Sequence, residues 1–440
     1  MARPRIVIVG AGFAGHQAAR TLSRTARGRA RITLVNPTDY FLYAPLLPEV
    51  ATGVLEPRRI AVPLAGSLPG VELVLGQARR VDVKGRQVSV TDPEGREHEL
   101  GYDRLILSVG SVNKLLPVPG ITEHAHGFRG LPEALYLRDH ITRQLELADT
   151  AEDPAERAAR STFVVVGAGY TGTEVAAHGV LYTADLARRL PRLRREEPPR
   201  WLLLDVAERV LPELDPRLSR TAANVLTDRG VRLRLGTSVA EATADGVRLT
   251  DGSSVPTRSL IWCVGVRPDP LVDELGLPTE RGRLLVDEHL AVPGCPGVFA
   301  CGDAAAVPDP NRPGEYTPMT AQHAVRQGRL AARNVAASCG QGAMRPYRHR
   351  ELGFAVDLGG PDAAADPLHI PLAGAAAKAV TRGYHLASLP SNRARVAADW
   401  LLGALVPRQT VQLGLVRGSV VPLENTSPET PVLPRSPGDG

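Results

Sequence analysis

The sequence of 440 residues predicts an α/β fold in which one strand–turn–helix module occurs twice. Residues 5–24 have the pattern of an apolar strand, a glycine-rich turn and a helix, and residues 162–179 repeat it. Each module is followed by a second strand, several short strands and a strand that ends in glycine, at Gly110 and at Gly265. Because the strands are apolar without alternation, we predict two similar parallel sheets covered by helices, with a distinct C-terminal region.

The first glycine-rich turn has the sequence GAGFAG, which contains Gly10, Gly12, Ala14 and Gly15. The first glycine permits the tight turn, the second lets the backbone approach a pyrophosphate, and the third allows helix and strand to pack closely. The helix N-terminus favours the phosphate charge. This arrangement predicts a Rossmann-like dinucleotide site. At the end of the second strand, where an acidic residue is usual, Asn36 would contact the ribose.

The second glycine-rich turn, GAGYTG, contains Gly167, Gly169 and Gly172. The residue at the end of its second strand is Asp205. A carboxylate there accepts hydrogen bonds from both ribose hydroxyls and repels a 2′-phosphate, so we predict NADH in preference to NADPH. The nearby Arg209 is the residue that would favour NADPH.

Hydride transfer between a nicotinamide and a flavin explains why one chain has two dinucleotide sites, because the flavin supplies the redox chemistry and the protein supplies position. The motif VFACGDAA follows both sites and contains Gly302 and Asp303. Asp303 would accept a hydrogen bond from the ribityl hydroxyls. The helix from Ala321 would direct its N-terminus at the flavin, where negative charge develops on reduction. We therefore assign FAD to the first turn and NADH, as a substrate, to the second.

Composition and charge argue against several other classes. The net charge is +5, but no block of Lys or Arg is interleaved with aromatic residues, so we expect no nucleic-acid partner. The four cysteines form no CxxC pair and the histidines no HxxH pattern, which predicts no metal site and fits a reducing, cytoplasmic compartment. No apolar run reaches about 18 residues, and residues 1–12 lead directly into a strand, so we expect no transmembrane helix and no signal peptide.

With these motifs, residues 1–335 resemble the two-dinucleotide flavoprotein reductases, the superfamily that contains glutathione reductase. The resemblance implies that LILSVGS, with Ser108 and Gly110, and LIWCVGVRPDP, with Gly265, are the strands that leave the two nucleotide sites. Within the superfamily the chain is most similar to type II NADH dehydrogenases, which are non-pumping NADH:quinone oxidoreductases. The similar segments are FLYAPLLPEVATGVLEPRRIAVPL, GxTGxE, AERVLP and TAQHAVRQG.

The first of these segments is rich in Pro, and we expect it to be a loop region beside the site. It contains no CxxxxC, so disulfide reduction is excluded. Sulfide:quinone reductases also need paired reactive cysteines, and we expect no such pair from Cys263, Cys301 and Cys339.

The predicted domain boundaries follow the order of the motifs. The FAD-binding domain comprises residues 1–158 and 287–342, and the NADH-binding domain comprises residues 159–286. The C-terminal domain comprises residues 343–424. The Pro- and Ser-rich tail at 425–440 is predicted to be disordered.

The resemblance also implies which residues act on the electron acceptor. The quinone-site signature AQxAxQxG begins at Ala321 and matches except at its second Gln, where Arg326 stands. We predict Gln322 and Glu174 as catalytic residues. Glu174 matches a glutamate that the family associates with nicotinamide binding and proton supply, and a buried carboxyl with a raised pKa would relay protons to a quinone.

Because Arg326 interrupts the signature, two further hypotheses stay open. One is a soluble NAD(P)H-dependent flavin reductase that acts on a different small-molecule or protein acceptor. The other is a flavoprotein whose NADH-bound state signals and whose turnover is incidental.

The C-terminal region is basic, with Asp399 as the one acid among residues 371–408 and with Lys378, Arg382, Arg393, Arg395 and Arg408 as its cations. The helix predicted at 393–406 is too short to span a bilayer and would place five apolar residues near one face, namely Val396, Trp400, Leu401, Ala404 and Leu405. Such a helix either packs on the other domains or lies in a membrane interface. We expect the second, on the inner face of the cell membrane, and the resemblance further implies a homodimer.

Overall fold

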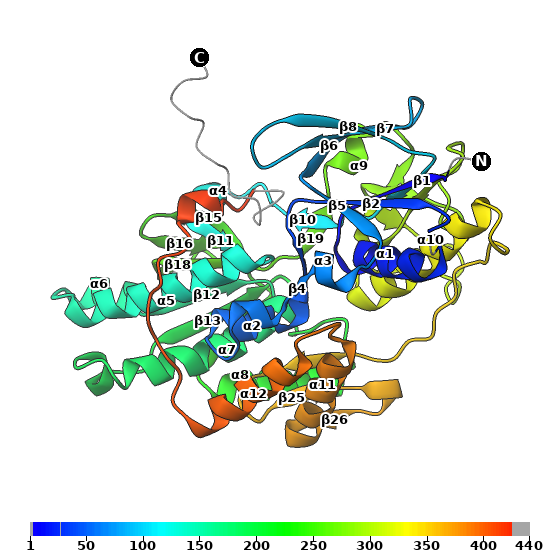
Figure 1. Cartoon of the computed structure of the whole chain (residues 1–440). Helices are drawn as coiled ribbons and strands as arrows, with labels where there is room; N and C mark the ends of the chain where they lie inside the picture. Colours follow the sequence, from blue (N-terminus) through cyan, green and yellow to red (C-terminus); the bar gives the residue numbers. More distant parts are fainter. Residues whose placement is uncertain (1–2, 27, 425–440) are drawn as a thin grey trace, which may run out of the picture.

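A computed structural model of the chain describes residues 3–26 and 28–424, so the predicted disordered tail lies outside the described residues. Two five-stranded parallel sheets form the centres of two similar units (Figure 1). Their strand orders correspond, with β5–β2–β1–β9–β22 in the first unit and β14–β13–β12–β18–β11 in the second. The predicted α/β fold with a duplicated parallel-sheet unit is therefore confirmed.

The first unit is built around apolar, almost fully buried strands. β22 reaches it from a segment that follows the whole second unit, and it pairs with β9 in parallel. The helices α1 and α10 pack closely, because Gly328 of α10 lies against the backbone of Ala14, where a Cβ atom would collide. The elements are β1 (Arg5–Val9), α1 (Phe13–Thr25), β2 (Arg31–Asn36), β5 (Val71–Leu75), β9 (Arg104–Leu107), β22 (Val298–Ala300) and α10 (Ala321–Ser338).

The second unit repeats this plan around a fully buried central strand, TFVVV. Its helices α5 and α7 are tied by a buried hydrogen bond of 2.7 Å between the hydroxyls of Thr142 and Tyr182. The elements are β11 (Ala125–Gly127), α5 (Leu131–Thr150), α6 (Pro154–Arg160), β12 (Thr162–Val166), α7 (Tyr170–Ala187), β13 (Arg200–Asp205), α8 (Pro216–Asp228), β14 (Val231–Leu235) and β18 (Ser259–Trp262).

Short antiparallel strands accompany each unit, and one pair joins the two units. The Asp92–Gly95 turn connects β7 and β8. β10 and β19 pair across the units in an antiparallel manner. These strands are β6 (Gln77–Asp82), β7 (Gln87–Thr91), β8 (Glu97–Gly101), β10 (Ser111–Asn113), β15 (Val239–Thr243), β16 (Gly246–Leu249), β17 (Ser254–Pro256), β19 (Val266–Pro268), β20 (Thr279–Glu280), β21 (Arg283–Leu285) and β23 (Ala305–Ala306).

The Pro-rich segment after β2 is not the loop region that the sequence suggests. β3 (Tyr40–Leu42) pairs with β4 (Ala61–Pro63), and α2 (Leu47–Ala51) lies between them. All five residues of α2 are buried. The prolines start short helical turns here, because their fixed φ suits the first helical position. Burial of the apolar side chains then packs α2 against α5 and α7 of the second unit. Three other short helices are α3 (Leu64–Ser67), α4 (Ile121–His124) and α9 (Leu271–Glu274).

The C-terminal region packs a three-stranded sheet and two helices below the second unit (Figure 1). It consists of β24 (Ala355–Asp357), β25 (Ala363–Ala365), β26 (Leu372–Ala373), α11 (Gly374–Ser388) and α12 (Arg393–Leu405). After α12 the chain, red in Figure 1, runs back along the outside of the second unit toward α4. The backbone amides of Leu413 and Gly414 bond the carboxylate of Asp139, and Leu423 is 1% exposed in the core of the second unit.

The orientation of α12 differs from the predicted single apolar face. Val396 and Trp400 are buried, whereas Leu401 is 62% exposed and Leu405 is 72% exposed. At 3.6 residues per turn, Leu405 lies opposite Val396 on the helix, so one face could not contain both. In the described ranges, no helix is both long and apolar enough to cross a membrane.

We expect Leu423→Ala to lower the free energy of unfolding by about 2–5 kcal/mol, because it leaves a cavity in the core under the returning C-terminal segment. Chemical denaturation measures the change. The matched control is Leu415→Ala in the same segment, where the side chain is 70% exposed and the expected change is below about 0.5 kcal/mol. Equal effects of the two substitutions would show that the segment is not anchored at Leu423.

Candidate active site

The two glycine-rich turns have the same backbone geometry. The first glycine of each has a positive φ, +92° at Gly10 and +103° at Gly167, and it lies against the carbonyl of the strand that leaves the site. A Cβ atom on the third glycine, Gly15 or Gly172, would collide with the carbonyl oxygen of the first. Each turn is therefore closed on the protein side by contacts that only glycine allows.

The second glycine of each turn has different surroundings. A Cβ atom on Gly12 or on Gly169 would meet nothing within 4 Å. The backbone there borders open space at the start of α1 and of α7, where a pyrophosphate would lie against the helix N-terminus. The residues of both turns thus fit a bound dinucleotide.

The strand-end residues Asn36 and Asp205 occupy corresponding positions. The Oδ1 atom of Asn36 accepts a hydrogen bond of 2.8 Å from the amide of Ala11, and Oδ2 of Asp205 accepts one of 2.5 Å from Ala168. Each side chain therefore stabilises the second residue of its own turn. Their predicted contacts with ribose stay predictions.

Gly302 and Asp303, which we call the GD motif, lie where α1, β22 and α10 converge. A Cβ atom on Gly302 would approach Ala14 of α1 to 3.0 Å and Ala324 of α10 to 3.8 Å. The Oδ2 atom of Asp303 accepts a hydrogen bond of 2.8 Å from Ser111. Burial raises the pKa of Asp303, while the Ser111 hydroxyl and the guanidinium of Arg283 lower it. A half-buried acceptor at this junction fits the ribityl hydroxyls of FAD.

Gln327 supports this motif, although the signature treats its position as variable. Its Oε1 atom accepts a hydrogen bond of 2.8 Å from the amide of Gly302, and its Nε2 donates to Thr317 at 2.9 Å. It is 1% exposed. Neither Gln327 nor Ser111 was among the residues predicted from the sequence, because only the fold brings them to the GD motif.

Arg326, which interrupts the quinone-site signature, turns toward Gln322. Its guanidinium donates to Oε1 of Gln322 at 3.2 Å and to the carbonyl of Arg350 at 3.1 Å. Gln322 in turn donates to the carbonyl of Gly353 at 2.8 Å. Both side chains therefore fasten the start of α10 to residues 350–353, and α10 begins at Ala321 as predicted.

Glu174 lies in the first turn of α7, directly after the second glycine-rich turn. Its Oε1 atom accepts a hydrogen bond of 3.0 Å from the amide of Asp357 in β24. Burial raises the pKa of the Glu174 carboxyl to about 8, and the nearby carboxyls of Asp357 and Glu49 act in the same direction. Glu174 is thus a carboxyl that holds its proton near neutral pH, as the proton-supply hypothesis requires.

A group of charged side chains continues from Glu174 across the junction of α2, α7, β24, α11 and α12. We call it the junction cluster. It consists of the half-buried Glu174 and four buried residues, Glu49, His178, Asp357 and Lys378. The ammonium of Lys378 lies 2.5 and 2.6 Å from the two oxygens of Asp357. The Nε2 atom of His178 lies 3.1 Å from Oδ1 of Asp357. Although burial opposes it, His178 and Lys378 hold the pKa of Asp357 well below its usual range.

Glu49, His178 and Asp357 place one possible ligand atom each within 4.8 Å of one another, which is a spacing that metal ligands also have. The ammonium of Lys378 already contacts both oxygens of Asp357 and supplies the positive charge. We therefore assign the junction cluster to ion pairing and proton chemistry.

The surface role predicted for Lys378 is wrong, because it is 6% exposed and bonded to Asp357. Arg382 of the same helix lies 4.7 Å from the ring centre of Trp400.

Sequence reasoning also missed Glu49. The available signal was an ionisable residue inside an apolar, Pro-rich run.

Comparison with known proteins agrees with this geometry. The family model described as pyridine nucleotide-disulphide oxidoreductase matches residues 4–328, and the chain belongs to that family. Its fold and two nucleotide sites are those of FAD-dependent enzymes that use NADH.

Individual relatives indicate a narrower group within this family. The chain is 32% identical to the type II NADH:quinone oxidoreductase Ndh of Mycobacterium tuberculosis, over 76% of this chain and 73% of the relative. It is 30% identical to the demethylphylloquinone reductase NdbB of Synechocystis, over 91% of this chain and 96% of the relative. Within the family, the chain is a member of the type II NADH:quinone oxidoreductase group. The structure of NDH2 from Plasmodium falciparum in complex with NADH has the same fold, with a TM-score of 0.85 and 16% sequence identity. The match covers 93% of this chain and 100% of that one.

Substitution of the second and third glycines of the first turn should have separable effects. Gly15→Ala places a methyl group into the backbone of Gly10, so we expect a lower melting temperature and loss of FAD. Gly12→Ala meets no protein atom, so we expect an unchanged melting temperature of the apoprotein and FAD binding weakened by about tenfold or more. Thermal unfolding and flavin absorbance measure the two effects. A lower apoprotein melting temperature for Gly12→Ala would contradict the assignment.

Proposed function

We propose that the chain transfers electrons from NADH through FAD to a quinone without pumping protons. The observation that carries this proposal is the half-buried Glu174, which bonds the C-terminal region and holds a proton near neutral pH at the junction of the two nucleotide-binding units and that region. Reduction of a quinone to a quinol needs protons as well as electrons, and a positioned carboxyl can supply them. The names of the relatives support the same acceptor.

Each nucleotide has residues suited to it. Gly10, Gly12 and Asp303 would hold FAD, which when bound accepts hydride from NADH and passes electrons onward. Gly169 and Asp205 would hold NADH. The guanidinium of Arg209 donates to the carbonyl of Pro212, so it is engaged away from the Asp205 carboxylate, which supports NADH over NADPH.

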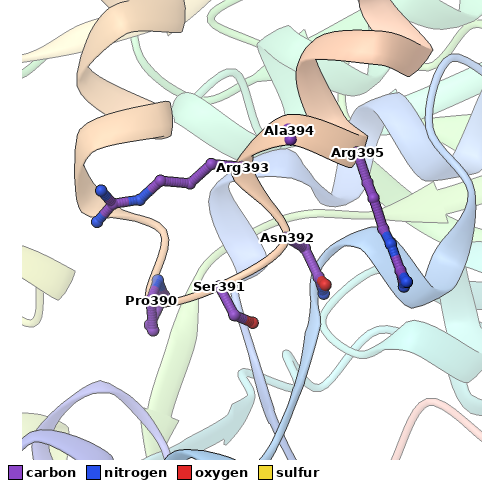
Figure 2. Close-up of a pocket in the computed structure, with 6 residues that line it drawn as sticks. All are labelled: Pro390, Ser391, Asn392, Arg393, Ala394 and Arg395. Carbon is purple, nitrogen blue, oxygen red and sulfur yellow. The ribbon is translucent and has the colours of Figure 1, made fainter.

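We also propose that α12 and the segment after it bind the surface of the cell membrane, on its inner face. Support comes from exposed apolar side chains, namely Leu401, Leu402, Leu405, Val411, Leu413 and Leu415. An open hollow lined by residues 390–395 lies at the start of α12, and the guanidinium groups of Arg393 and Arg395 point to opposite sides of it (Figure 2). Basic and apolar side chains on one element suit an anionic bilayer surface. A homodimer is proposed on the resemblance alone.

The function is tested by stopped flow. The purified yellow protein is reduced with NADH or NADPH and mixed with menaquinone analogues, ubiquinone analogues or ferricyanide. We expect NADH to reduce the flavin faster than NADPH, and at least one quinone to reoxidise it within the turnover time. Slow reoxidation by every quinone, with fast reoxidation by another acceptor, would favour the flavin-reductase alternative. Absence of reduction by NADH would favour the signalling hypothesis.

Membrane attachment is tested by flotation with vesicles that contain anionic phospholipid. Replacement of both Leu401 and Leu405 by Ser should weaken binding by at least about tenfold, because each Leu contributes about 1.5–3 kcal/mol when it leaves water. Val206→Ser is the control, since Val206 is 75% exposed but lies after β13, away from α12. Equal binding of the two variants would contradict this docking surface.

A further inference from the structure

The charges of the junction cluster do not balance if every acid is ionised. Three carboxyls, those of Glu49, Glu174 and Asp357, face the single ammonium of Lys378. That ammonium contacts both oxygens of Asp357. Burying an unpaired carboxylate is costly, so such a group takes up a proton instead. The imidazole of His178 bonds the Asp357 carboxylate as well, so within the part of the chain that the structure describes Glu49 and Glu174 have no cation bonded to them and are expected to hold protons.

Glu49 is the more deeply enclosed of these two. It is 2% exposed and projects from α2 toward side chains of α7, β24, α11 and α12. Its Oε2 atom accepts a hydrogen bond of 2.6 Å from the indole of Trp400. Its Oε1 atom has no hydrogen-bond partner among the described residues. A buried carboxylate with one unsolvated oxygen is much more costly than a neutral carboxyl in the same place.

Some charged neighbours of Glu49 raise its pKa and others lower it. Burial and the carboxylate of Asp357 raise the pKa of Glu49, whereas His178, the indole of Trp400 and Lys378 lower it. The carboxyl of Glu174 lies close enough for the two acids to repel each other, and Arg408 approaches from beyond α12. The charge of Glu49 therefore influences the protonation of Glu174.

We propose that Glu49 is a second proton-holding carboxyl, which returns a proton to Glu174 after Glu174 has protonated the reduced acceptor. This inference rests on the proposed function. Glu49 is a positioning and relay residue, because it acts through Glu174 and not on the acceptor itself. Glu49 and Glu174 lie close enough for their charges to interact, and the carboxylate of Asp357 and the imidazole of His178 each place a polar atom within 4.8 Å of a carboxyl oxygen of Glu49.

The reaction balances as NADH, one proton and quinone giving NAD⁺ and quinol. The hydride of NADH carries two electrons and one proton equivalent, and the remaining proton leaves the carboxyl of Glu174. The Glu174 carboxylate then takes up the proton that Glu49 releases. Glu49, ionised for that interval, recovers a proton from the solvent, so the net uptake is one proton per turnover.

The pH dependence follows from the raised pKa values. At Glu174 the folded protein holds its proton up to about pH 8, whereas the unfolded chain releases it near the ordinary value of 4.5. The free energy of unfolding therefore decreases as the pH rises through this window. Glu174→Gln should remove part of that decrease, and so should Glu49→Gln, because Gln cannot ionise.

Infrared difference spectroscopy of the holoenzyme tests whether Glu49 carries a proton. We expect a protonated-carboxyl band at neutral pH that shifts in D₂O and that Glu49→Gln removes. Glu288→Gln, at an exposed side chain, is the matched control and should leave the band unchanged. Trp400→Phe should keep the band but shift it, because one hydrogen bond to the carboxyl is lost. An unchanged spectrum in Glu49→Gln means that Glu49 is ionised and overturns the proposal.

Stopped flow then tests whether that proton is used. In Glu49→Gln we expect reoxidation by quinone to slow by about a hundredfold, at the lower end of what a positioned proton donor contributes, with a larger solvent isotope effect. Reoxidation by ferricyanide, which binds no proton, should stay as in the wild type. Wild-type rates with quinone in Glu49→Gln, despite loss of the infrared band, overturn the relay. If the wild type itself reacts with no quinone, the proposed function fails, and the infrared result still decides the protonation of Glu49.

Discussion

The buried pair of Lys378 and Asp357 is the interaction on which the arrangement of the three parts depends. Lys378 belongs to α11 and Asp357 to β24, while His178 and Glu174 of α7 bond to Asp357 from the second unit. Removing two charges from water is unfavourable, and only a complete set of hydrogen bonds offsets it. That set exists only when the C-terminal region is docked on α7. The pair therefore specifies one docking geometry, even where it adds little net stability.

The same junction explains why α2 is a buried helix. Glu49 could not be enclosed by a mobile loop, because its carboxyl needs the indole of Trp400 as a donor and a dry environment to retain its proton. Trp400 lies on the buried face of α12, whereas Leu401 and Leu405 on the same helix are exposed. One side of α12 therefore exposes leucines to solvent, while its other side contacts the junction cluster through Trp400. Any surface that binds those leucines acts on the helix that positions Glu49.

Sequence patterns were sufficient where the chemistry is local. The two glycine-rich turns predict the parallel sheets and the start of each helix, because a tight turn and a close helix–strand contact need glycine at fixed spacing. They could not predict the junction cluster, whose members lie at positions 49, 174, 178, 357 and 378 and meet only in the folded chain. The face of α12 was predicted wrongly because apolar residues were counted without their helical angles, and Lys378 because a charged residue was taken to be exposed.

Arg326, which stands where the quinone-site signature has Gln, shows how a fold can accommodate a departure from a signature. A polar side chain at this position needs acceptors, and Arg326 finds them in Gln322 and in the carbonyl of Arg350. The adjacent Gln327 meanwhile bonds the amide of Gly302 from the buried side of α10. Successive residues of a helix point about 100° apart, so the two side chains serve different partners. The start of α10 is consequently held from both sides, and the arginine that interrupts the motif leaves the N-terminal end of the helix in place.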